Sequence, residues 1–285
     1  MPTLHSRCLC GEVAWDADGP PGFMTHCHCA RCRKTHGTAF ATYLTAPADG
    51  FRFERGEDRI VRYESSPDFF RTFCGGCGSV VPNGQAWEGQ VFLPAGPLDD
   101  DPEVRPAAHI FVGSKAPWYE IPDALAQFDT YPEGVDAPAL DDLPSRAAPG
   151  GTRGSCLCGG VAFRVTGEVL RVWGCHCSRC RKARSAAHGA NLFTTADGVD
   201  VTSGADLFVS YKLPEARFFT HVFCRVCGAP LPRIDRSRNL AVIPMGALDD
   251  DPGVRLQHHI FVGSKAPWFE IADRLPQHAE YPPQT

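Results

Sequence analysis

The sequence predicts a mainly β protein built from two tandem copies of one cysteine-rich domain. Short apolar runs are separated by Gly, Pro or Asp, and no long stretch keeps a helical period. The fourteen cysteines fall into two sets of seven with matching order. A block from His109 to Trp118 recurs unchanged from His259 to Trp268, which indicates an internal duplication.

Length and charge narrow the class of protein. Each copy has roughly 135 residues, enough to bury a core of its own, so we expect two independent cores. The net charge is −5 and no run of Lys or Arg occurs, which argues against nucleic acid or an anionic membrane as partner. No apolar stretch approaches the roughly 18 residues of a membrane span, and residues 1–5 do not resemble a signal peptide. We therefore expect a soluble cytoplasmic protein.

The first copy is predicted to occupy residues 3–133. A glycine follows the Cys8-Leu9-Cys10 chelate and an apolar run follows Gly11, a pattern typical of a tight turn leading into a strand. Helical turns are expected at the Cys27–Lys34 stretch and near Ile121–Phe128. The further predicted strands, mostly antiparallel, are Ala39–Leu44, Phe51–Glu54, Ile60–Tyr63, Phe69–Phe73, Val91–Leu93 and His109–Val112.

Residues 134–151 have the Pro, Gly and small-residue composition of a linker, and the second copy is predicted at residues 152–285. Cys8 and Cys156 match at an offset of 148, whereas Cys74 and Cys224 match at 150. Because Tyr211 still matches at 148, the two extra residues of the second copy lie between Tyr211 and Cys224. Leu98-Asp-Asp-Asp-Pro102 also recurs, as Leu248 to Pro252.

The cysteine spacing predicts metal sites. Cysteine makes up about five per cent of the chain, below the level of small disulfide scaffolds, and all of it stands at chelate spacings. Seven thiols cannot all pair within one copy, but four plus three make one closed tetrahedral zinc site and one site with a vacant position. Spacing leaves the grouping open, because Cys29-x-x-Cys32 with Cys74-x-x-Cys77 would also make an ordinary four-cysteine site.

The ordered motifs identify a family. Cys-x-Cys-Gly, Cys-His-Cys-x-x-Cys-Arg-Lys, Phe-Cys-x-x-Cys-Gly and His-Ile-Phe-Val-x-Ser-Lys-x-Pro-Trp occur in this order in the first copy, and the second copy repeats all four. This combination resembles the glutathione-dependent formaldehyde-activating family, which includes centromere protein V. The resemblance covers nearly all of each copy outside the linker and implies small coiled antiparallel sheets of the β-tent type with few short helices.

The resemblance also implies the metal ligands, with up to four zinc ions per chain, two structural and two with an open position. The implied structural ligands are Cys8, Cys10, Cys74 and Cys77 in the first copy and Cys156, Cys158, Cys224 and Cys227 in the second. The implied catalytic ligands are Cys27, Cys29 and Cys32, and Cys175, Cys177 and Cys180.

A zinc held by three thiolates is a poor Lewis acid toward water but suits a further sulfur ligand, whose thiol pKa it lowers. The expected activity is therefore that of a carbon–sulfur lyase or synthase resembling S-(hydroxymethyl)glutathione synthase. A zinc-bound, glutathione-like thiol would add to a small aldehyde such as formaldehyde, or be released from it. A small thiol and a small electrophile are the expected partners.

Residues beside the cysteines are the candidates for substrate binding. Arg31, Arg33 and Lys34 could hold the carboxylates of glutathione, or form a solvated basic turn. His28 and His176, between ligands, are expected to point outward or to bond backbone. His109 and His259 are expected to be satisfied core or edge histidines, and Trp118 and Trp268 packing anchors.

The copies differ beside the three-cysteine motif. Gly37 of the first copy, also a substrate-binding candidate, becomes Ser185, and Arg71 becomes His221. The first copy is therefore expected to be the more active one, with Cys29→Ser removing most activity. The alternative is a zinc-stabilised interaction module without catalysis. A methionine sulfoxide reductase is disfavoured because no free nucleophilic cysteine remains, and a DNA-binding finger because no basic recognition helix occurs.

Overall fold

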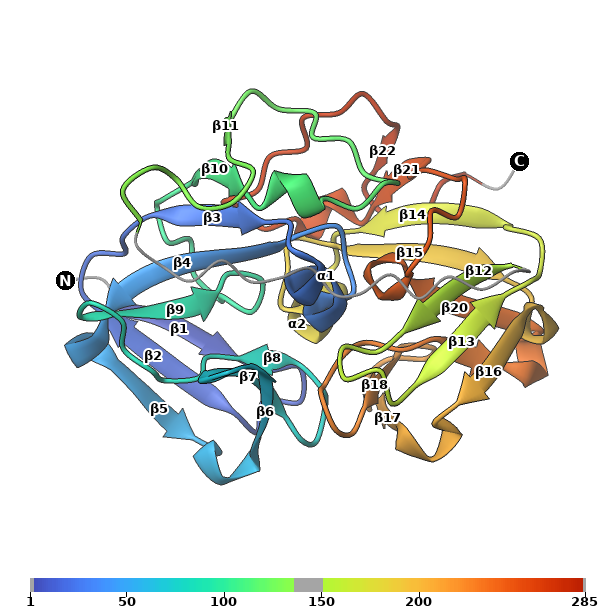
Figure 1. The fold of residues 1–285 in the computed structure, drawn as a ribbon, viewed down its shortest axis with the longest axis horizontal. Helices are drawn as coiled ribbons and strands as arrows, with labels where there is room; N and C mark the ends of the chain where they lie inside the picture. Colours follow the sequence, from blue (N-terminus) through green and yellow to red (C-terminus); the bar gives the residue numbers. More distant parts are fainter. Residues whose placement is uncertain (1–2, 136–150, 284–285) are drawn as a thin grey trace.

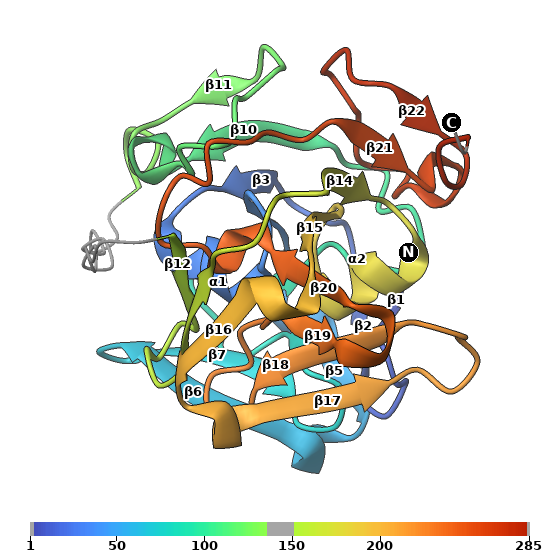
Figure 2. The same ribbon diagram turned by 90° about the vertical axis from the view of Figure 1, so that its right-hand side faces the viewer.

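The structure, a computed structural model, describes residues 3–135 and 151–283. Its first copy, blue to green in Figure 1, lies beside its second copy, yellow to red, and the helices α1 (Ala30–His36) and α2 (Ser178–Arg184) lie between them. Figure 2 shows the same arrangement from the side of the second copy. The fold is mainly β with few short helices, as the sequence predicts.

Each copy follows the same plan of small sheets. The strands of the first copy are β1 (Thr3–Arg7), β2 (Ala14–Asp18), β3 (Met24–Cys27), β4 (Ala41–Pro47), β5 (Phe51–Arg55), β6 (Ile60–Ser66), β7 (Phe69–Cys74), β8 (Val80–Val81), β9 (Gln90–Pro94), β10 (Pro106–Ile110) and β11 (Ala126–Gln127). Those of the second copy are β12 (Thr152–Ser155), β13 (Ala162–Val165), β14 (Arg171–Cys175), β15 (Gly189–Thr194), β16 (Val199–Ser203), β17 (Phe208–Lys212), β18 (Thr220–Cys224), β19 (Arg233–Asp235), β20 (Leu240–Pro244), β21 (His258–Ile260) and β22 (Gln277–His278).

The sheet that carries the three-cysteine motif is mixed, not purely antiparallel. Its strand order in the first copy is β11-β10-β3-β4-β9, and in the second β19-β20-β15-β14-β21-β22. β3 pairs antiparallel with β4 but parallel with β10, and β14 pairs likewise with β15 and β21. The parallel pairing brings the recurring block that begins at His109 against the strand that ends at Cys27. The remaining sheets are β1-β2-β5, β6-β7-β8, β12-β13-β16 and β17-β18.

The prediction of a helical turn near Ile121–Phe128 is wrong. This segment contains only the short strand β11, and Asp123 Oδ1 accepts a hydrogen bond from Leu125 N at 3.0 Å. A side chain that bonds its own backbone two residues on favours a turn over a helix. The helix expected at the three-cysteine motif does form, as α1.

The expectation of two independent cores is also wrong. One buried cluster joins residues of both copies, including Trp118 and Trp268, which are packing anchors as expected. Phe73 and Phe223 meet with ring centroids 6.1 Å apart. Tyr63 of the first copy packs against the cysteine cluster of the second, and Tyr211 packs against the core that contains Cys8, Cys74 and Cys77. Each copy therefore covers part of the other.

Two sequence expectations concern the chain beyond the core. The predicted linker, residues 134–151, falls almost wholly outside the described residues, and the predicted domain limits stay a prediction. Among residues 3–135 and 151–283, no helix is both long and apolar enough to cross a membrane.

Candidate metal centres

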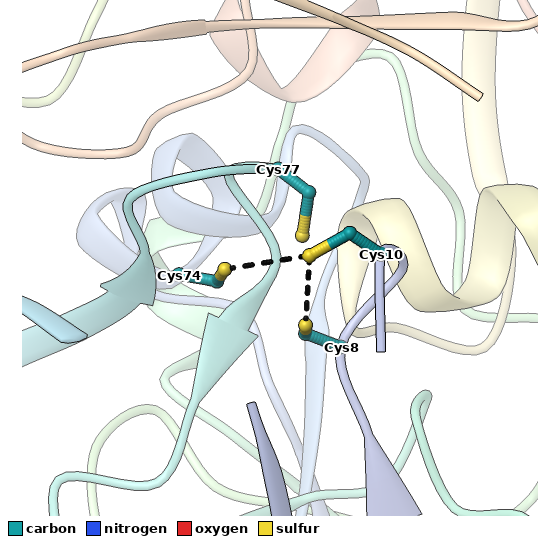
Figure 3. A group of neighbouring side chains, drawn as sticks. All are labelled: Cys8, Cys10, Cys74 and Cys77. Atoms are coloured by element: carbon teal, nitrogen blue, oxygen red, sulfur yellow. Dashed lines mark hydrogen bonds between the residues drawn. The ribbon is translucent and has the colours of Figure 1, made fainter. Parts of the chain in front are cut away.

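Four cysteines of the first copy form one compact sulfur cluster, shown in Figure 3. Cys8 and Cys10 lie in the turn after β1, and Cys74 ends β7 just before the turn that carries Cys77. The Sγ atom of Cys10 lies 3.4 Å from that of Cys8 and 3.7 Å from that of Cys74. In the second copy, Cys158 Sγ lies 3.3 Å from Cys156 Sγ and 3.9 Å from Cys224 Sγ, with Cys227 in the same cluster.

Left-handed glycines form the turns that carry these cysteines. Gly11 has a φ of 77° and Gly78 a φ of 76°, which L side chains rarely adopt. The chain folds back sharply enough for Val13 N to donate to Cys8 Sγ at 3.3 Å. The donor set fits zinc, because four sulfurs about 2.3 Å from a tetrahedral ion stand roughly 3.8 Å apart. The structure thus has the four-cysteine grouping that the family resemblance implies, not the alternative that spacing allowed.

The remaining cysteines form two three-sulfur clusters with the same backbone. Cys27 ends β3, Cys29 precedes the first residue of α1, and Cys32 lies in its first turn. Cys32 N donates to Cys29 Sγ at 3.3 Å, and in the second copy Cys180 N donates to Cys177 Sγ at 3.4 Å. All ligand atoms of each cluster lie within 4.8 Å of one another. Both clusters could therefore hold a metal ion through three thiolates.

The first three-cysteine cluster is enclosed by side chains. All three of its cysteines are buried, and Phe111, Tyr43 and Tyr131 pack against them. The buried Arg71 places Nη2 3.5 Å from Cys32 Sγ. Burial alone would lower the pKa of Arg71, but Cys32, Tyr43 and Cys29 together outweigh it, and the net pKa is raised. Arg71 is thus a fixed cation beside this cluster.

The second three-cysteine cluster opens to a cavity. Cys177 and Cys180 are half-buried and, with Cys175, line a cavity of about 1100 Å³. The smaller Asn191 stands where the first copy has Tyr43, and His221 stands where it has Arg71. Asn191 and His221 both line the cavity. The two clusters share their ligands but differ in the layer around them.

The arginine and the histidine beside each cluster occupy swapped positions in the two copies. The first copy has Arg71 and His36, and the second has His221 and Arg184 at the matching positions. Burial lowers the pKa of His36 to about 4 and that of His221 to about 3, so both are neutral near pH 7. Burial also lowers the pKa of Arg184 to about 10, so Arg184 is still charged near pH 7. Each cluster therefore has one neutral histidine and one arginine, which is buried in the first copy and half-buried in the second.

A histidine–histidine–aspartate chain, with both histidines buried, lies beside each three-cysteine cluster. His28 Nε2 lies 2.8 Å from His109 Nδ1, and His109 Nε2 lies 3.0 Å from Asp123 Oδ1. His176, His259 and Asp273 repeat this chain with distances of 2.9 and 2.8 Å. Since an ionised carboxylate only accepts, His109 donates from Nε2 and accepts at Nδ1 from His28.

These chains correct the prediction that His28 and His176 point outward or bond backbone, because both side chains are fully buried and pair with another histidine. His109 and His259 are satisfied core histidines, as expected. Sequence analysis missed Asp123 and Asp273. Their signal was their recurrence fourteen residues after the matching histidine.

Two of the four predicted substrate-binding residues, Lys34 and Gly37, contact the other copy. Lys34 Nζ is buried and lies 2.7 Å from Asp249 Oδ1, with a further hydrogen bond of 2.8 Å to the Ser155 carbonyl. Lys182, its counterpart, pairs at 2.6 Å with Asp99 of the first copy. The repeated acidic motif thus receives the lysine of the other copy. A substrate role for Lys34 does not fit, because its donors are already occupied.

The other three candidates lie on or beside α1. Gly37 ends this helix with a φ of 62°, and an added Cβ would lie 2.9 Å from the Arg184 and Pro230 side chains. The close approach at Gly37 is therefore to the second copy and not to a ligand. Arg31 Nε donates to the Ser65 carbonyl at 3.3 Å, and Arg33 is half-buried on the same helix.

Comparison with known proteins gives one family. Residues 3–114 and 151–264 each match the sequence model described as "Glutathione-dependent formaldehyde-activating enzyme". A search of curated proteins finds no match. A crystal structure of a Rhodobacter sphaeroides protein, a structural-genomics target, is 24% identical over 36% of this chain and 98% of its own, with a TM-score of 0.28. At that TM-score the similarity supports no conclusion about fold or function.

Proposed function

Because the chain belongs to the glutathione-dependent formaldehyde-activating family, we propose that it makes or breaks a carbon–sulfur bond between a thiol and a small aldehyde. The reaction takes place at Cys175, Cys177 and Cys180. The observation that carries this proposal is that Cys177 and Cys180 are half-buried and line a cavity large enough for both reactants. Formaldehyde is the proposed aldehyde.

The two four-cysteine clusters would hold structural zinc, since four thiolates complete a tetrahedral shell. The second three-cysteine cluster would hold zinc with one position left for a ligand. Zinc, when bound there, lowers the pKa of a thiol ligand from about 8.5 and favours the thiolate near neutral pH. The protein contributes a cavity that holds the aldehyde beside that position.

The proposed reaction balances without an oxidant or reductant. The thiol sulfur forms a bond to the carbonyl carbon, the carbonyl π bond breaks, and the thiol proton ends on the carbonyl oxygen. The reverse reaction splits the same carbon–sulfur bond. The half-buried Arg184 supplies the positive charge that offsets the thiolates of this cluster.

This assignment reverses the expectation that the first copy is the more active. Cys27, Cys29 and Cys32 are buried beneath aromatic side chains, with Arg71 beside Cys32. We propose a structural role for any metal held there. The first copy then supports the fold, and the second carries the reaction.

The test is metal stoichiometry combined with thiol titration. We expect up to four metal ions per chain and, after cobalt substitution, a change in the absorption spectrum of one of them when glutathione is added. Formaldehyde should then be consumed faster than with glutathione alone, as followed by NMR. If no bound metal responds to any thiol, the protein is a zinc-stabilised interaction module and the proposed reaction is wrong.

A further inference from the structure

The cavity beside the second three-cysteine cluster is lined by positive side chains. Its lining contains no Asp or Glu among the described residues, although the whole chain has a net charge of −5. Such a cavity attracts anions, because low-dielectric walls concentrate the field of charges of one sign. The arginines that line it are Arg171, Arg179, Arg184, Arg217, Arg233 and Arg238.

Aromatic rings hold several of these guanidiniums in place without neutralising them. Arg171 lies 4.7 Å from the centre of the Trp173 ring. Arg238 and Arg217 lie 4.2 and 4.7 Å from the centre of the Phe218 ring. In the described chain, none of the six arginines forms an ion pair with a carboxylate. Asp235, outside the lining, interacts electrostatically with Arg233 and Arg238, and Arg184 faces the cysteines. The six arginines outnumber these partners, so the lining keeps a net positive charge for a ligand.

This positive lining belongs to the second copy alone. The positions that match Arg171, Arg184, Arg233 and Arg238 hold Phe23, His36, Asn83 and Glu88. Arg217 lies in the segment where the second copy has its two extra residues, and only Arg179 has an arginine counterpart, Arg31. Most of these arginines therefore occur only beside the open cluster of the second copy. They are not part of the cysteine motif that both copies share.

From this juxtaposition we infer that the cavity binds a polyanionic thiol, with two or more negative charges remote from its sulfur. The inference rests on the proposed function, since the cavity adjoins the proposed thiol position. The ammonium group of glutathione offsets one of its two carboxylates, so glutathione leaves most of the arginines without a partner. Phosphate groups match guanidinium donors in geometry and carry more charge, so a phosphate-bearing thiol suits the cavity better.

The experiment compares three thiols on the metal-loaded full chain. Coenzyme A carries a thiol and several phosphates, glutathione carries carboxylates and an ammonium, and 2-mercaptoethanol is uncharged. Binding is followed by the fluorescence of Trp173, which lines the cavity, with Trp173→Phe identifying its signal. We expect coenzyme A to bind at least about tenfold more tightly than the other two, and its affinity to fall as salt is added.

The variant Arg233→Gln/Arg238→Gln removes two charges of the lining and should weaken coenzyme A binding about tenfold or more. The matched control is Arg59→Gln/Arg62→Gln in the first copy. It removes the same charge and also one cation–π contact, that of Arg62 on Phe70 at 4.9 Å. We expect this control to bind coenzyme A like the unmodified protein.

The outcomes separate the two proposals. Equal affinities for the three thiols, or equal losses in both arginine double variants, would overturn the inference and leave the proposed reaction standing. S-methyl coenzyme A tests the opposite case, since it keeps the phosphates but has no free thiol. If it binds in an arginine-dependent way while no thiol alters the metal spectrum, the anion site stands and the proposed reaction fails.

Discussion

The two three-cysteine clusters have the same ligand spacing and the same strand-to-helix turn, but different surroundings. Arg71, Tyr43 and Tyr131 enclose the first, whereas Asn191 and His221 leave the second at the edge of a cavity. The arginine beside each cluster also comes from different elements, β7 in one copy and α2 in the other. Residues outside the ligand motif therefore determine whether the cluster is enclosed or opens to a cavity.

The largest expected effect separates the two clusters directly. Cys177→Ser should lower the rate of thiol–aldehyde reaction about 100-fold or more, because it removes a ligand of the open cluster. Cys29→Ser should retain most of the activity per folded molecule. Initial rates by NMR, with the folded fraction measured by circular dichroism, provide the check. Greater damage from Cys29→Ser would show that the first copy carries the reaction.

A second test gives the open cluster of the second copy the surroundings of the enclosed cluster. Asn191→Tyr/His221→Arg/Arg184→His gives the second copy the residues of the first at three positions while keeping one arginine beside the cluster. We expect the cavity to close and thiol affinity to fall about 30-fold, measured by titration of the cobalt form. Asn191→Leu is the control, since it keeps the size of the side chain without adding a charge, and it should leave the cavity open. Unchanged affinity in the triple variant would mean that other residues control access.

The next largest effect is expected on stability, from the ion pairs that join the two copies. Lys34→Met should lower the free energy of unfolding by about 2 kcal/mol, because Lys34 is buried and its loss leaves Asp249 unpaired. Lys182→Met should cost about 1 kcal/mol or less, since its partner Asp99 is more exposed. Urea denaturation of the metal-loaded protein measures both. Equal losses would contradict the asymmetry between the two ion pairs.

The smallest expected effect concerns pH and position 188, where the first copy has Phe40. His188 packs against His176, His259 and Phe269, and burial lowers its pKa from 6.5 to about 3. Above pH 6.5 it is neutral in both folded and unfolded states. As pH falls from 6.5 toward 3, the unfolded chain gains a proton that the folded chain rejects, so stability falls about 1.4 kcal/mol per pH unit.

His188→Phe should remove the pH-dependent loss of stability that His188 causes. Between pH 7 and pH 5.5 the variant should therefore lose about 1 kcal/mol less stability than the unmodified protein. Urea denaturation at the two pH values is the measurement. Loss of metal and titration of the other histidines affect both proteins, so only the difference between them reports on His188. An equal loss in the two proteins would show that His188 is not held neutral.

Much of the fold could be predicted because its signals are local. The strands β5, β6, β7 and β9 lie within a few residues of the apolar runs that predicted them. The helix at the three-cysteine motif was also expected. The parallel pairing of β3 with β10 was not, since its two strands are separated by about 80 residues and nothing local specifies their direction.

The candidate site was predicted only in part. The cysteine groups followed from a family resemblance and not from spacing, which allowed another arrangement. Lys34 was expected near a ligand because it follows the cysteines, but its partner Asp249 lies in the other copy. Sequence distance from a motif gives no information on which side of a helix meets the second domain.

The sequence by itself determined that the chain is duplicated, mainly β and equipped with chelating cysteines, because repeats, apolar runs and short spacings are properties of neighbouring residues. Only the tertiary structure decided that the copies share a core, that histidine–aspartate chains lie beside the three-cysteine clusters, and that one cluster is enclosed and the other open. These features depend on side chains that are far apart in the sequence and meet only when both copies pack together.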